Sequence, residues 1–182
     1  MNYATIKNCD IANGPGVRVS LFVSGCTHRC KGCFNEVAWD FFYGQPFTQD
    51  TIDDILKMLA PGYVKGITLL GGEPFEPQNQ PAILDLLRQM KNKFPDKTVW
   101  AFSGYLFDQD ILSGRLGPWE ITEEYLGYID VLVDGPFVEA KKNLNLRFRG
   151  SSNQRIIDVP ASLSKGEIVF WEDWQGHERG MK

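Results

Sequence analysis

The sequence predicts an α/β domain built on a parallel sheet. The first observation is an alternation of strand-like and helix-like segments along 182 residues, without repeats or linker-like composition between them. The second is that four predicted strands end in short polar or glycine-rich stretches, which read SGC, GGEP, SGY and DGP. The third is an ordinary globular composition, with 43% hydrophobic and 23% charged residues. A chain of this length can bury a substantial core.

The first predicted strand spans residues 17–23, where valine and leucine at alternate positions share one face. The stretch NGPG at 13–16, directly before it, is a strong turn signal. Three of the four cysteines follow at once, in the stretch SGCTHRCKGCFN at 24–35. These cysteines are therefore expected on a loop at the carboxyl end of the strand.

Helical periodicity begins after this loop. Apolar residues at 52, 55, 56 and 59 share one face of a helix from Thr48, its N-cap, to about Ala60. A second helix is predicted from about Pro81 to Phe94, with proline at its first position. A short helix is expected around 122–127, and the stretch 106–120 has no clear period. The remaining predicted strands are 65–70, 98–102, 131–133, 154–159 and 167–171.

In parallel α/β folds, the ligand site lies at the carboxyl ends of the strands. The cysteine loop, Gly71-Gly72, Ser103-Gly104 and Asp134-Gly135 each follow a predicted strand. All four stretches are therefore expected at one edge of the sheet, which is where the sequence places an active site.

The three cysteines have the spacing Cys-x3-Cys-x2-Cys, at Cys26, Cys30 and Cys33. Structural zinc usually takes four ligands, often in two separated pairs, and no second pair is present. A redox Cys-x2-Cys pair would leave Cys26 without a role. An iron–sulfur cubane held by three thiolates leaves one iron without a protein ligand, and an open metal position is what catalysis requires. Structural zinc and buried thiols remain the alternatives at this point.

The string CTHRCKGC at 26–33 carries the CxxxCxxC motif of the radical S-adenosylmethionine enzymes, and the chain resembles that family. The resemblance implies a [4Fe–4S] cluster on the three cysteines, with its open iron chelated by the amino and carboxylate groups of S-adenosylmethionine. Phe34 resembles the aromatic residue that packs the adenine. GGEP at 71–74 resembles the second motif, in which Gly72 and Glu73 meet the methionyl amine.

The cofactor-binding residues that follow from this resemblance lie on the loop after the first strand and at the other strand ends. Asp134 and Ser103 have turn-forming roles as alternatives, and Arg149 is expected to bind the cofactor's carboxylate or hydroxyls. The predicted set is Gly32, Cys33, Phe34, Gly71, Gly72, Glu73, Ser103, Asp134 and Arg149.

Further stretches resemble one group within this family, the activators of anaerobic (class III) ribonucleoside-triphosphate reductases. For this group the resemblance implies reductive cleavage of S-adenosylmethionine to a 5′-deoxyadenosyl radical, which takes a hydrogen atom from a glycine of the reductase. It also implies that reductase as protein partner and a flavodoxin-like electron donor. The stretches are DIANGPGVR at 10–18, LFVSGCTHRCKGCFN at 21–35, GQPFT at 44–48, VLVDGPFV at 131–138 and RGSSNQ at 149–154.

The implied fold is a partial, open (βα) barrel of the radical-S-adenosylmethionine type, trimmed to about five or six strands. Residues 1–157 would form the activase core. Residues 158–182 would be a C-terminal extension packed on that core or trailing from it. Two alternative functions stay open: another small enzyme of the family, such as a formate-lyase-type activase or a deazapurine synthase, and a non-catalytic metal-binding module.

Charge and composition limit the classes of partner and the location that we expect. A net charge of −4 and a pI near 5.2 give no general electrostatic reason to bind nucleic acid or an anionic membrane. No apolar run approaches a membrane span, and the start lacks a signal-peptide pattern, so the cytoplasm is the expected location. Cys9, outside the motif, is predicted to be a small buried hydrophobe. His28 is assigned no role.

Overall fold

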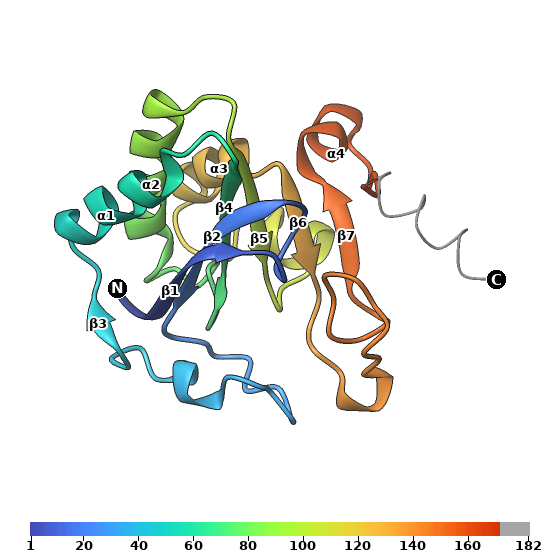
Figure 1. The fold of residues 1–182 in the computed structure, drawn as a ribbon. Helices are drawn as coiled ribbons and strands as arrows, with labels where there is room; N and C mark the ends of the chain where they lie inside the picture. The colour runs from blue at the N-terminus through green and yellow to red at the C-terminus, as the bar shows by residue number, and fades with distance from the viewer. Residues whose placement is uncertain (172–182) are drawn as a thin grey trace.

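A seven-stranded mixed sheet organises residues 1–171, which are the residues that the computed structural model describes (Figure 1). Its spatial order is β3-β1-β2-β4-β5-β6-β7. The four central strands run parallel, and β1, β3 and β7 are joined antiparallel at the two edges. The strands are β1 (Asn2–Asp10), β2 (Val17–Val23), β3 (Gln45–Pro46), β4 (Val64–Gly71), β5 (Thr98–Phe102), β6 (Val131–Asp134) and β7 (Arg155–Asp158).

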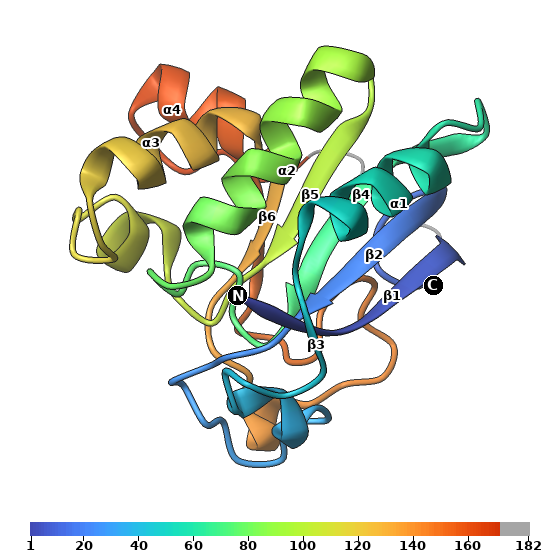
Figure 2. The ribbon, with the colours of Figure 1, turned by 90° about the vertical axis from the view of Figure 1, so that its left-hand side faces the viewer.

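Three helices, α1 (Gln49–Leu59), α2 (Gln80–Lys93) and α3 (Trp119–Tyr128), lie along one face of the sheet (Figure 2). Helix α1 begins at the predicted cap, where Thr51 Oγ1 accepts a hydrogen bond of 3.2 Å from the Thr48 N–H. Pro81 stands in the first turn of α2, as its fixed φ angle favours. The apolar stripes of these helices pack on inward side chains of β2, β4 and β5 in the main core. Both longer helices are thus confirmed, and α3 extends beyond the predicted 122–127.

The opposite face of the sheet carries a second, smaller apolar cluster of Trp100, Val131, Val133 and Ile156. Beside it Arg18 is almost fully buried on β2. Its guanidinium donates to Thr68 Oγ1 at 2.8 Å and to the Ile67 carbonyl at 2.7 Å, which ties β2 to β4. Burial lowers the pKa of Arg18 to about 10. Side chains alternate between the two faces of a strand. The seven residues of β2 therefore supply Arg18 to this face and apolar side chains to the main core on the other face.

The antiparallel strands β1 and β3 were not predicted from the sequence, whereas β7 falls within the predicted strand at 154–159. Strand β1 has largely exposed and intermediate residues, so no apolar alternation marks it, and β3 is two residues long. The predicted strand at 167–171 is reduced to one bridge between Phe170 and Ile157. A single turn of π-helix at Phe107–Ile111 fills part of the stretch without a period. The open barrel form implied by the resemblance stays a prediction.

The prediction that Cys9 is buried was wrong. It is exposed, with a φ of 58°, where the register between β1 and β2 shifts between Lys7 and Asp10. Its Sγ lies 3.8 Å from the Tyr63 hydroxyl. A register shift of this kind turns a side chain out of the alternating pattern of a strand. The residue type of Cys9 alone does not reveal the shift.

Beyond β7 the chain forms α4 (Val159–Lys165), capped by the Asp158 carboxylate, which accepts from the Ala161 N–H at 2.9 Å. Val159 joins the main core. The rest of the predicted extension from 172 onward, with Trp174, lies outside the described residues. Within residues 1–171, no helix is both long enough and apolar enough to cross a membrane.

Candidate functional site

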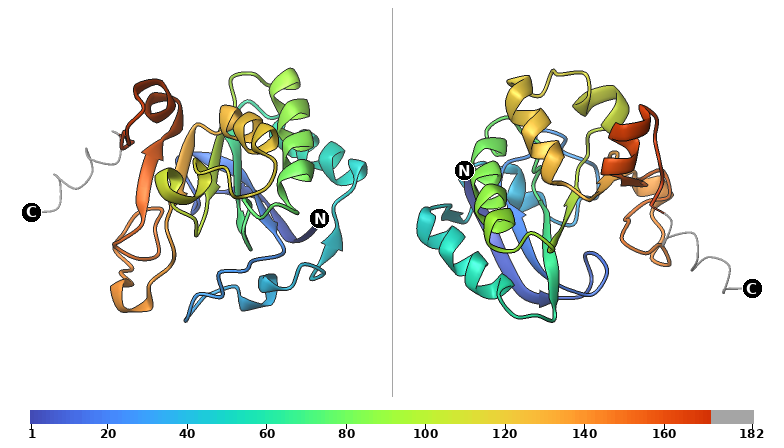
Figure 3. Two further views of the ribbon diagram at one scale, coloured as in Figure 1. Left: turned by 180° about the vertical axis from the view of Figure 1, so that it is seen from behind. Right: turned by 90° about the horizontal axis from the view of Figure 1, so that it is seen from above.

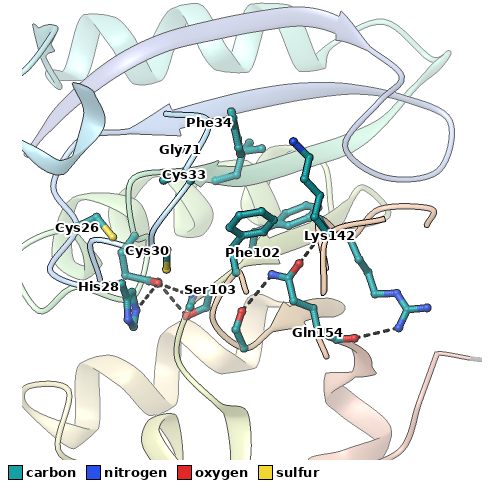
Figure 4. Close-up of a pocket in the computed structure, with 18 of the residues that line it drawn as sticks. Cys26, His28, Cys30, Cys33, Phe34, Gly71, Phe102, Ser103, Lys142 and Gln154 are labelled. Carbon is teal, nitrogen blue, oxygen red and sulfur yellow. Dashed lines mark hydrogen bonds and ion pairs between the residues drawn. The ribbon is translucent and has the colours of Figure 1, made fainter. Parts of the chain in front are cut away.

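A cavity of about 420 Å³ lies at the carboxyl ends of the parallel strands, the edge that the sequence predicted. In Figure 4 the cysteine loop lies on one side of it, and Lys142 and Gln154 lie on the other. The volume is within the usual range of small-molecule sites. Nearly all of the predicted site residues line it: Cys26, Cys30, Gly32, Cys33, Phe34, Gly71, Gly72, Glu73, Ser103 and Arg149.

The cysteine loop is tied to the short 3₁₀ helix at Glu36–Trp39 that follows it. The Gly25 N–H donates to the Ala38 carbonyl at 2.8 Å, and the Cys26 N–H donates to the Trp39 carbonyl at 3.2 Å. Within the loop the Cys33 N–H donates to the Cys30 carbonyl at 3.1 Å. All three cysteines are half-buried and face the same cavity.

The glycine-rich stretch after β4 lies directly against the start of the cysteine loop. The Gly72 N–H donates to the Val23 carbonyl at 2.7 Å, and the Glu73 N–H donates to the Gly25 carbonyl at 2.8 Å. A Cβ atom on Gly72 would lie 2.5 Å from the Gly25 carbonyl oxygen, inside contact distance. Glycine at 72 therefore allows close contact between the two loops, in addition to the approach to a cofactor that its motif implies.

Glu73 is 1% exposed, and its carboxylate accepts four hydrogen bonds. Oε1 accepts from the Phe75 N–H and from Ser103 Oγ, each at 2.9 Å. Oε2 accepts from the Gly104 N–H at 2.7 Å and lies 3.1 Å from His28 Nε2. A carboxylate has about four acceptor positions, so this one is saturated. Glu73 therefore joins the cysteine loop to the loop after β5.

His28 is a site residue that the sequence analysis missed. Its ring lines the cavity and packs on Tyr105, with centroids 4.2 Å apart. Burial alone would lower the pKa of His28, but the hydrogen bond and negative charge of Glu73 outweigh it, and the net pKa is raised. The neighbouring Thr27 donates from its backbone N–H to Glu76 Oε1 at 2.8 Å. The position of His28 inside the cysteine motif was the available signal, but its partner Glu73 lies 45 residues away in the sequence.

Asp134 is the one predicted cofactor residue that does not line the cavity. It is fully buried, and Oδ1 accepts from Arg155 Nε at 2.8 Å. Oδ2 accepts from the Phe107 N–H at 2.8 Å and from Arg155 Nη2 at 2.5 Å. The structure therefore gives Asp134 the role of joining β6 to β7 and to the loop after β5, while the adjacent Gly135 reaches the cavity.

Arg149 belongs to the segment between β6 and β7 that forms the far side of the cavity. Its Nη1 donates to the Gln154 carbonyl at 2.9 Å. Gln154 Oε1 accepts from the Gly150 N–H at 2.8 Å and from the Ser151 N–H at 3.2 Å. Figure 2 shows this segment and the loop after β2 at the same end of the sheet.

Two of the three thiols lie where the surroundings disfavour the thiolate. Burial raises the pKa of Cys26 to about 12, and burial together with the neighbouring Cys33 raises the pKa of Cys30. A metal ion deprotonates a thiol that coordinates it, so metal uptake here would release protons. In residues 1–171 no group of three or more His, Cys, Asp and Glu side chains is arranged around a single metal ion, whereas the ligands of a cluster of several irons are spaced more widely than those of one ion.

The chain belongs to a class of iron–sulfur proteins, because a family model described as a 4Fe-4S single cluster domain matches residues 12–157. The donor set fits such a cluster, since three thiols line one cavity and thiolates are the usual cluster ligands. The chain belongs to the family of anaerobic ribonucleoside-triphosphate reductase-activating proteins.

Relatives of that name are similar over most of their length. The protein of Enterobacteria phage T4 is 42% identical over 159 residues, which cover 86% of this chain and 93% of the relative. The protein of Escherichia coli (strain K12) is 43% identical, with 85% and 96% covered. That of Vibrio cholerae is 41% identical, with 86% and 97% covered.

Proposed function

We propose that the chain activates an anaerobic ribonucleoside-triphosphate reductase by forming a glycyl radical on it. The supporting observation is that Cys26, Cys30 and Cys33 line one cavity together with Gly71 and Gly72, at the carboxyl ends of parallel strands. When bound, a [4Fe–4S] cluster supplies the electron that reductively cleaves S-adenosylmethionine, and hydrogen abstraction from a glycine of the reductase follows. The names of the relatives give the protein substrate.

In this proposal Cys26, Cys30 and Cys33 would hold the cluster, and an iron without a protein ligand would be available to S-adenosylmethionine. Gly71 and Gly72 line the same cavity as the three thiols. The Glu73 carboxylate already accepts four hydrogen bonds within the protein, so it serves to fix the two loops against each other. The methionyl amine is then left to backbone groups of this stretch.

The rest of the cavity favours exclusion of water. Leu70, Phe102 and Leu146 bring apolar surface into it from the sheet and from the segment between β6 and β7. A reactive radical needs such shielding, because water and stray hydrogen donors compete for it. Phe34, 85% exposed at the edge of the cavity, is placed to pack against the adenine or against the reductase.

The proposal includes two further elements. The electron comes from a small flavodoxin-like carrier, a donor of one electron per turnover. The second is that the four parallel strands β2, β4, β5 and β6, with helices on one face, would be the core of the trimmed open barrel that the resemblance implies. Leu70 near the end of β4 and Phe102 at the end of β5 line the cavity.

The test is electron paramagnetic resonance on the anaerobically reconstituted protein mixed with its cognate reductase, S-adenosylmethionine and dithionite. The expected result is a glycyl radical on the reductase, absent for Cys30→Ala and retained for Cys9→Ala. Cys9 is a matched control, since it is exposed and does not line the cavity. A reconstituted protein that cleaves S-adenosylmethionine but forms no radical on the reductase would refute the proposed substrate.

A further inference from the structure

The segment Val169–Trp171 lies beyond the region matched by the family model, and it is fixed along β7. The Val169 carbonyl accepts from the Asp158 N–H at 2.9 Å, and the Trp171 N–H donates to the Ile156 carbonyl at 3.1 Å. An antiparallel bridge joins Phe170 to Ile157 between these two bonds. After α4, therefore, the chain turns back and runs along the outer edge of the sheet.

This return places the Trp171 ring on the second apolar cluster. Trp171 packs edge-on against Trp100 of β5, with ring centroids 5.0 Å apart and planes at 86°. Trp100 in turn packs edge-on against Phe148, at 5.3 Å and 72°. Trp100 is 2% exposed, so it cannot move independently of its two neighbours. A chain of aromatic contacts thus joins the C-terminal segment to the segment between β6 and β7.

Phe148 lines the cavity, and its backbone is strained. Its φ of 55° lies in the left-handed region, where a bulky side chain is unfavourable. Such a conformation persists only when surrounding contacts hold it. Several neighbours of Phe148 on the same segment also reach the cavity: Lys142, Asn143, Leu144, Leu146, Arg149 and Gly150.

The segment is otherwise held mainly by bonds within itself, such as the bridge between Lys142 and Ser151 and the hydrogen bond from the Asn143 N–H to the Gly150 carbonyl. Residues 141–145 are exposed, and Leu144 is 89% exposed. Gln154 ties its base to Gly135, donating from Nε2 to that carbonyl at 3.0 Å. Figure 3 shows, in the view from behind, that the segment projects at the end of β7 opposite to α4. Besides the hydrogen bonds at its base, the packing of Phe148 on Trp100 and its cluster joins this wall to the sheet.

We propose that Trp171 is a positioning residue for this cavity wall. By holding Trp100 against Phe148, the C-terminal segment keeps residues 142–150 in the conformation that encloses the ligand. The identity of that ligand, S-adenosylmethionine, rests on the proposed function. The ordering of the wall itself does not.

The first experiment needs no cofactor. Hydrogen exchange is followed by mass spectrometry in the metal-free Trp171→Ala, Trp171→Phe and Trp119→Ala variants. Trp119, at the start of α3 and about one-third exposed, is the matched control. Expected is faster exchange in peptides covering 142–150 for Trp171→Ala, with β4 unchanged, and near-normal exchange for the other two. Unchanged exchange over 142–150 in Trp171→Ala would overturn the proposal.

The second experiment measures S-adenosylmethionine cleavage by the reconstituted variants. Aromatic pairs of this kind correspond to up to about a tenfold effect, so Trp171→Ala is expected to raise KM roughly fivefold to tenfold, with kcat within about twofold. Trp171→Phe should restore KM, which a general loss of folding would not allow. An unchanged KM would contradict the positioning role. If the wild-type protein does not cleave S-adenosylmethionine, the proposed function fails. The hydrogen-exchange result still decides whether Trp171 keeps residues 142–150 in place.

Discussion

The two walls of the cavity are held in different ways. The first, formed by the cysteine loop and the stretch after β4, is held by backbone hydrogen bonds between adjacent strand ends and by the buried Glu73 carboxylate. The second, residues 142–154, is held by the Gln154 side chain and by aromatic contacts that reach from β5 and from the C-terminal segment.

The difference separates binding of the cluster from enclosure of the ligand. The first wall carries the thiols, and its position follows from strands in the core, so it should keep its shape without ligand. The second wall is mostly exposed and depends on a few side chains, so it should be the part that loosens first. Substitutions in each wall should reveal these separate roles.

The largest effect is expected from the thiols. Changing Cys26, Cys30 or Cys33 to alanine removes a cluster ligand, and the reconstituted protein should lose its iron and sulfide. Cleavage of S-adenosylmethionine should fall by at least about 100-fold, the scale of losing an essential catalytic element. Iron and sulfide analysis with the absorption spectrum is the measurement. Cys9→Ala should retain iron, sulfide and cleavage activity. A full iron content in Cys33→Ala would contradict the assignment of Cys33 as a cluster ligand.

The second effect concerns the close contact within the first wall. Gly72→Ala introduces a Cβ 2.5 Å from the Gly25 carbonyl oxygen, so the two loops must separate. The expected loss is about 3 kcal/mol of unfolding free energy, at the upper end of overpacking costs. The control is Gly62→Ala, where no atom lies within 4 Å of the added Cβ. Denaturant unfolding of the metal-free variants measures both, and equal stabilities would refute the close contact.

A third variant tests the saturated carboxylate. Glu73→Gln places an amide against the Gly104 N–H or against Phe75 and Ser103, which leaves buried donors without an acceptor. The expected cost is about 2 kcal/mol. In Glu76→Gln the remaining oxygen can keep both hydrogen bonds from Thr27, which fall on Oε1 alone, so about 0.5 kcal/mol is expected. Thermal unfolding distinguishes the two, and a smaller loss for Glu73→Gln than for Glu76→Gln would contradict the account.

The smallest effect is expected in the second wall. Gln154→Leu removes the side-chain bonds to Gly150, Ser151 and Gly135, at a cost of about 1 kcal/mol because these groups are partly open to water. Exchange should quicken at 149–151 and stay unchanged in β2. Gln89→Leu, on the exposed face of α2, serves as control. Faster exchange in both walls would show that they are not independent.

Much of the first wall could be predicted from the sequence, because its features are local. The strand before the cysteines, the glycines after β4 and the N-cap of α1 each follow from short-range patterns. Ser103 was placed at the site by its position after a strand, and the structure shows its hydroxyl bonded to Glu73. The same reasoning placed Asp134 at the site, but its carboxylate accepts hydrogen bonds from Arg155 and from the Phe107 N–H instead.

The second wall could be predicted only in part, because its supports are distant in sequence. No local pattern connects Trp171 to Trp100. The two residues are far apart in the sequence, and they meet because the chain returns along β7 after α4. The link between His28 and Glu73 is likewise a tertiary contact. Cys9 was assigned by residue type alone, and the register shift in β1 reversed its exposure.

The central claim is that the three cysteines leave one iron open for S-adenosylmethionine. The most direct measurement is electron–nuclear double resonance on the dithionite-reduced protein with S-adenosylmethionine labelled with ¹⁵N at its amine. The account predicts a hyperfine coupling between the cluster and the labelled nitrogen. A reduced cluster whose spectrum shows no such coupling, with S-adenosylmethionine in saturating amount, would contradict it.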